Sequence, residues 1–119
     1  MSYDLGLKDP VSGDWCYLNT PHFMQGGTFC RSGEHTATIN ITYNYCHHFR
    51  VAMENKNGIR ALYGMTGAKS ISILKDAISK LKNDVSDDYW EATEGNAKRA
   101  LLQCLALAEM RPDGIWDGD

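Results

Sequence analysis

The chain has 119 residues and a formal net charge of −3, with 43% hydrophobic and 23% charged residues. These fractions are typical of a folded protein and argue against disorder, and the length suits one domain (1–119) but is short for a P-loop NTPase. The acidic balance disfavours generic DNA binding, because such binding depends on neutralising phosphates with Lys and Arg.

The N-terminal part predicts short antiparallel strands. The turn-rich stretch 9–13 separates SYDLGLK from DWCYL, which predicts a β-hairpin. Residues 36–45 (TATINITYNY) alternate between apolar and polar side chains and form the clearest predicted strand. Its odd-numbered face, which includes Ile39 and Ile41, is expected in the core, and its even-numbered face carries amides and hydroxyls. The pattern of residues 47–63 fits either a strand or a helix.

Two helices are predicted in the C-terminal half, at about residues 68–82 and 94–110. Thr66 or Ser70 can cap the first helix, and Thr93 can cap the second, which is apolar on nearly every face. A large aromatic residue, Trp116, is expected to dock on the core from the acidic tail. The expected fold class is α+β, with a small antiparallel β-sheet packed on the two C-terminal α-helices.

Both predicted helix starts combine a capping hydroxyl, a small residue and a cation within one turn. The segment YGMTGAKS (63–70) does not match a P-loop, because its glycines are too close together and Ala precedes Lys. Ordinary capping explains the pattern, but amides at a helix N-terminus also attract anions, and nearby aromatic rings can stack on a base. The candidate ligand-binding residues are Lys69, Lys98, Arg99, Thr66, Asn96, Tyr43 and Trp90.

Cysteine and histidine residues supply nitrogen and sulfur atoms without the spacing of a metal site. No C-x-x-C pair accompanies Cys46, His47 and His48, and adjacent histidines on a strand point to opposite faces. Cys46 with His47 or His48, and Cys30 with His35, are pairs that could act in thiol catalysis. Their spacing alone does not supply the required geometry. We therefore expect no metal, no cofactor and no catalytic residues.

The N-terminus, MSYDLGLKDP, carries two acids and has no apolar run of signal-peptide length. No segment approaches the ~20 apolar residues that span a bilayer. We therefore expect no membrane association and a cytoplasmic location, where cysteines stay reduced.

Four segments resemble recurring segments of a family of short uncharacterised proteins encoded in bacteriophages and prophages of Gram-positive bacteria. They are INITYNY (39–45), YGMTGAKSI (63–71), DDYWEATEGNAKRALLQ (87–103) and MRPDGIWDGD (110–119). The similarity covers most of the chain and departs mainly in the first hairpin and in residues 46–53. The resemblance implies a small phage accessory protein in the cytoplasm of the bacterial host, and it implies no catalytic roles.

The leading hypothesis is a non-enzymatic phage protein that counteracts a host process, most plausibly bacterial immunity, by sequestering a nucleotide-derived signal. The alternative is a masking inhibitor that binds a host defence protein through an acidic surface formed by residues 84–94 and 116–119. A small nucleotide hydrolase is a third and less favoured hypothesis. A homo-oligomer is also compatible with the sequence, because two copies can share one pocket.

Overall fold

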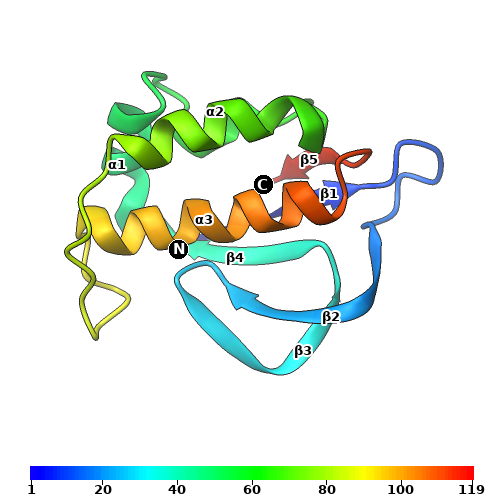
Figure 1. Ribbon diagram of the computed structural model, residues 1–119, viewed down its shortest axis with the longest axis horizontal. Helices are drawn as coiled ribbons and strands as arrows, with labels where there is room; N and C mark the ends of the chain where they lie inside the picture. The colour runs from blue at the N-terminus through cyan, green and yellow to red at the C-terminus, as the bar shows by residue number, and fades with distance from the viewer.

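The first strand of the chain is the centre of a three-stranded antiparallel sheet in the computed structural model (Figure 1). The model describes residues 1–119 apart from the side chains of residues 29–31. Strand β1 (Ser2–Lys8) pairs with β4 (Thr38–Thr42) on one side and with β5 (Ile115–Gly118) on the other. Its alternating apolar residues Tyr3, Leu5 and Leu7 are buried. The two ends of the sequence are therefore joined within one sheet.

The predicted N-terminal hairpin is only partly correct. The turn at 9–13 forms, because Gly13 N donates to Asp9 O at 2.9 Å and Lys8 bridges to Trp15. Beyond it the strands separate: β2 (Tyr17–Gln25) pairs with β3 (Thr28–Thr36) in a separate two-stranded ribbon. The reason is that both edges of β1 are taken by β4 and β5.

The predicted strand 36–45 is wrong at both ends. It is divided between the end of β3 and β4, and residues Tyr43–Tyr45 form a short 3-10 helix, η1. The Thr42 hydroxyl accepts a hydrogen bond from Asn44 N at 3.2 Å, which caps η1 and ends the strand. Burial of the odd-numbered residues is confirmed for Ala37, Ile39, Ile41 and Tyr45, whereas Thr42 on the even face is also buried.

The helices cover one side of this sheet, and α2 and α3 lie side by side and antiparallel (Figure 1). The ambiguous segment contains α1 (Cys46–Ala52) and a 3-10 helix, η2 (Gly58–Leu62). Helix α2 (Gly67–Ser79) begins after the cap Thr66 and ends three residues before the predicted position, and α3 (Glu94–Met110) begins after Thr93, as predicted. The expected α+β class, with antiparallel strands and helices, is confirmed. Among the described residues, none of the helices has the length and apolar character to span a bilayer.

Trp116 is the largest fully buried side chain and lies in the single core cluster. Its indole Nε1 donates to Ser70 Oγ at 2.8 Å, and Ser70 Oγ donates to Gly67 O at 2.7 Å. The expected docking of the tail is therefore confirmed, and the ring is both packed and hydrogen-bonded. Strand β5 is part of the core and does not form a solvated acidic tail.

Replacement of Trp116 should show how much the fold depends on this docking. Trp116→Ala is expected to lower the free energy of unfolding by about 3–5 kcal/mol, because it leaves a large cavity. Trp116→Phe keeps most of the packing and loses the bond to Ser70, so its cost should be smaller. Urea unfolding followed by circular dichroism measures both. A Trp116→Ala protein as stable as the wild type would contradict this account.

Candidate functional site

The start of α2 is occupied by the chain itself. Gly67 N donates to Gly114 O at 2.8 Å, and Ala68 N donates to Pro112 O at 3.0 Å. Lys69 N donates to the Thr66 hydroxyl at 3.1 Å. The amides that an anion would need are therefore used within the fold, and only the exposed Lys69 side chain is left for an external ligand.

The start of α3 does bind an anion, but the anion belongs to the chain. The Asp84 carboxylate accepts a hydrogen bond from Gly95 N at 2.9 Å, and the Thr93 hydroxyl accepts from Asn96 N at 3.0 Å. A Cβ atom on Gly95 would lie 2.5 Å from Asp84 C and from Val85 N. Glycine is thus required at position 95, because residues 84 and 85 approach the helix closely. The Asp84 carboxylate occupies the place at the helix start that the sequence suggested for a phosphate.

Two further candidates, Asn96 and Lys98, also serve the connection between the helices. The Asn96 side chain is fully buried, accepts from Ser86 N at 3.0 Å and donates to Asp88 O and Glu91 O. Lys98 Nζ donates to Asn83 Oδ1 at 2.7 Å. Both amide hydrogens of Asn96 are therefore in use, and its role is to organise this connection.

The two helix starts do not converge on one pocket. The start of α2 lies against the end of α3, because a Cβ atom on Gly67 would lie 2.7 Å from Arg111 O. Lys98, near the start of α3, instead reaches Asn83 beyond the other end of α2. Lys69 lies in the first turn of α2 (Gly67–Ser79), so most of this helix separates it from Lys98, which corresponds to ~15 Å of helix. Arg99 lies one residue further along α3, and its buried Nε has no hydrogen-bond partner among the described residues.

The connection between α2 and α3, residues 83–93 (the 83–93 loop), is anchored on its inner side by η1 and α1. Asn44 Nδ2 donates to Trp90 O at 2.7 Å, Tyr45 OH donates to Tyr89 O, and His48 Nε2 lies 2.8 Å from Ala92 O. Figure 1 shows this loop extending beyond the ends of the helices. No local sequence pattern predicts these anchors, because each bond joins residues 44 or more positions apart.

The outer side of the 83–93 loop presents apolar and acidic side chains together. Trp90 is 51% exposed and Val85 is 52% exposed. The ring of Tyr89 lies against the indole of Trp90, with 4.7 Å between their centroids. The exposed acids of this surface are Asp87, Asp88 and Glu91. A held backbone with a half-exposed aromatic side chain is a common basis for protein recognition.

Tyr43 precedes Asn44 in η1, but the contacts of its side chain are with Tyr3 and Arg60 rather than with the 83–93 loop. Its hydroxyl accepts from Arg60 Nη2 at 2.6 Å, and Arg60 Nε donates to Asp119 O at 2.9 Å. The Tyr43 ring is half-buried against Tyr3, with 4.4 Å between the ring centroids, so its contacts do not bring it together with Trp90.

The cysteine and histidine residues have structural surroundings. No group of three or more potential metal ligands occurs among the described residues, and the Cys30 side chain lies outside them. Burial raises the pKa of the Cys16 and Cys104 thiols, which disfavours the nucleophilic thiolate. The His48 imidazole is hydrogen-bonded to the 83–93 loop rather than to Cys46.

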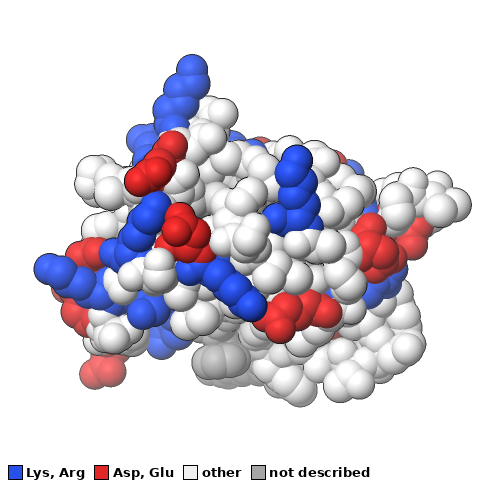
Figure 2. All heavy atoms as spheres, turned by 45° about the horizontal axis from the view of Figure 1, so that its top comes forward, with Lys and Arg blue, Asp and Glu red and all other residues white. Residues whose placement is uncertain are grey.

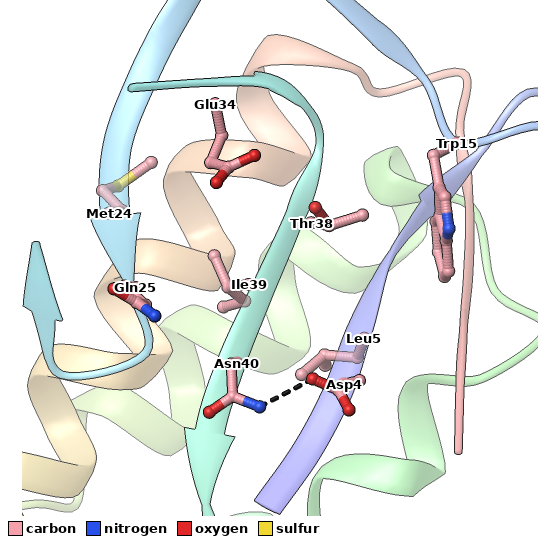
Figure 3. Close-up of a pocket in the computed structure, with 9 residues that line it drawn as sticks. All are labelled: Asp4, Leu5, Trp15, Met24, Gln25, Glu34, Thr38, Ile39 and Asn40. Atoms are coloured by element: carbon pink, nitrogen blue, oxygen red, sulfur yellow. Dashed lines mark hydrogen bonds between the residues drawn. The ribbon is translucent and has the colours of Figure 1, made fainter. Parts of the chain in front are cut away.

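A hollow of about 300 Å³ lies where the β2–β3 ribbon leaves the three-stranded sheet (Figure 3). Strands β1 and β4 provide one side of it, and Trp15 and the ribbon provide the others. The residues that line it are Asp4, Leu5, Trp15, Met24, Gln25, Glu34, Thr38, Ile39 and Asn40. Thr38 and Asn40 belong to the polar face expected for residues 36–45, but no local pattern predicts the hollow, because its lining comes from segments that are distant in the chain.

The charges on the helical side of the molecule are mixed. Figure 2 shows Lys and Arg interspersed with Asp and Glu over this face, without a broad patch of one sign. Such a surface lacks the continuous positive field that draws nucleic acid to a protein. Comparison of the chain with models of protein families, with curated proteins and with solved structures gave no match.

The self-capping of α3 can be tested at Asp84. Asp84→Ala is expected to lower the free energy of unfolding by about 1 kcal/mol, because the Gly95 amide loses its anionic acceptor at a helix N-terminus. Asp87→Ala, in the same loop, removes an exposed acid and should change stability little. Thermal unfolding of both variants provides the comparison, and equal losses would refute a special role for Asp84.

Proposed function

We propose that this protein is a non-enzymatic binding protein that masks a protein partner through the 83–93 loop. The observation that carries the proposal is that hydrogen bonds from the Asn44 and Asn96 side chains hold the loop backbone while Trp90 stays half-exposed. Together with the resemblance to phage proteins, this points to a host protein as the partner, and bacterial immunity is the process that we propose it counteracts.

The anchored backbone lowers the cost of binding. A flexible loop loses conformational entropy when it docks, whereas this one is already held by Asn44, Asn96 and His48. Tryptophan is enriched among the residues that dominate protein interfaces. The surrounding acids would favour a basic partner surface by raising the association rate and excluding acidic competitors.

Sequestration of a nucleotide is the less favoured function. Its best support is the indole of Trp90, which is 51% exposed and could stack on a base. The phosphate-binding part has weaker support, because the amides at both helix starts and the Asn96 side chain already have partners within the chain. The hydrolase hypothesis is weaker still, since no thiol among the described residues is hydrogen-bonded to a histidine that could act as its base.

Replacement of Trp90 should separate binding from folding. A photo-crosslinking amino acid at position 90, introduced in bacterial cells that produce the protein, is expected to capture the partner for identification by mass spectrometry. With that partner purified, Trp90→Ala should weaken binding at least tenfold, which corresponds to about 1.4 kcal/mol. Calorimetric titration measures the change.

Leu102→Ala is the matched control, because Leu102 is also an apolar residue that is 45% exposed but lies on α3 outside the loop. It should leave binding unchanged. Native mass spectrometry with a panel of cyclic nucleotides tests the competing function on the same samples. Stoichiometric retention of a nucleotide, with no protein crosslinked from position 90, would overturn the masking function.

A further inference from the structure

The hollow beside β1 and β4 has a chemistry of its own (Figure 3). Two carboxylates, those of Asp4 and Glu34, line it together with the side-chain amides of Gln25 and Asn40, and none of its nine lining residues is Lys, Arg or His. We propose that this hollow binds an organic cation, namely a guanidinium or ammonium group carried on a short apolar stem.

The negative charge in the hollow is not neutralised from within the described chain. Neither Asp4 nor Glu34 takes part in a salt bridge there, and Lys8, on the same strand as Asp4, instead pairs with Asp117 at 2.8 Å. A bound cation would therefore supply the positive charge that the described residues do not place beside these two acids. Charge-assisted hydrogen bonds to carboxylates are stronger than neutral ones, so these acids are the main source of affinity.

The carboxylate of Asp4 is already oriented for this task. Asn40 Nδ2 donates to Asp4 Oδ1 at 2.6 Å and to Ser2 Oγ at 2.7 Å. On the backbone side, Asp4 N donates to Asp119 Oδ1 at 3.0 Å. A carboxylate that is held by neighbouring groups loses little freedom when a ligand binds it.

The rest of the lining suits an apolar stem better than a bare metal ion. Met24 contributes a flexible thioether at the ribbon side, whereas Leu5 and Ile39 line the hollow with side chains that are almost fully buried. The Trp15 ring adds an aromatic wall, and the Lys8 ammonium already lies 5.0 Å from its centroid, so the two carboxylates rather than this ring must hold the bound cation. Because no described group of three metal-ligating residues exists, the carboxylates are too few to hold a metal without further ligands.

The probes for the test are butylguanidinium and butylurea, which have similar shapes and differ in charge. Butylguanidinium is expected to bind with a Kd of ~1 mM, and butylurea should bind at least ~10-fold more weakly. Chemical shifts of Asp4, Thr38 and Asn40 amides in a nuclear magnetic resonance titration report binding at the hollow. High salt should weaken the guanidinium complex, because the two acids are partly exposed to solvent.

Variants of the two acids identify the source of the affinity. Glu34→Gln removes a charge that has no described hydrogen bond, and Asp4→Asn retains the oxygen that accepts from Asn40. Each is expected to weaken butylguanidinium binding ~10-fold. Glu109→Gln, an exposed acid on α3, is the control and should leave the Kd unchanged. If Asp4→Asn fails to fold, Glu34→Gln alone decides.

Three results would overturn the proposal: no saturable binding of butylguanidinium, equal binding of butylurea, or affinity that does not change in Glu34→Gln. A blocked Gly-Arg-Gly peptide, compared with its citrulline counterpart, distinguishes the origin of the cation. Tighter binding of the arginine peptide than of butylguanidinium assigns the hollow to a protein side chain, and weaker binding assigns it to a small free organic cation. Position 90 does not line this hollow, so the result of the butylguanidinium titration is independent of the masking function.

Discussion

The pairing of the last strand with the first determines much of what this molecule can offer to a ligand. Strand β5 delivers Trp116 to the core, where Ser70 binds its indole. The turn that leads into β5 places the carbonyls of Pro112 and Gly114 on the first amides of α2. Closing the sheet therefore also uses the donors that would have made this helix start attractive to a phosphate.

At the start of α3, too, a group of the chain itself takes the place that an external anion could occupy. Asp84 lies only 11 residues before Gly95, so its carboxylate is present at a high effective concentration at the helix start. The preference of such a helix end for an anion is real, but the nearest anion in the chain satisfies it. A capping hydroxyl, a glycine and a lysine in sequence therefore describe an anion site without identifying its occupant.

Local signals in the sequence were sufficient for α2 and α3 and for the burial of Ile39 and Ile41, but not for α1, η1 and η2. Thr66 and Thr93 cap their helices through the residues that immediately follow, and Ile39 and Ile41 face the core through simple alternation. Strand partners could not be predicted, because they depend on which segments compete for the edges of β1. The loop anchors and the hollow were missed for a similar reason: their contacts join segments that are far apart in the chain, such as Asn44 with Trp90.

The distribution of ion pairs explains why the surfaces that stay open are better suited to cationic groups than to phosphates. Several cations are held within the fold, including Lys8 by Asp117, Lys80 by Asp76 and Arg111 by Asp113. Two of these pairs also hold the pKa of the Asp117 and Asp113 carboxyls below their usual value, so both acids stay charged at neutral pH. The acids of the 83–93 loop and of the hollow are not compensated in this way. These acids are therefore open to a cationic partner, and Trp90 supplies the apolar contact that charge alone does not provide.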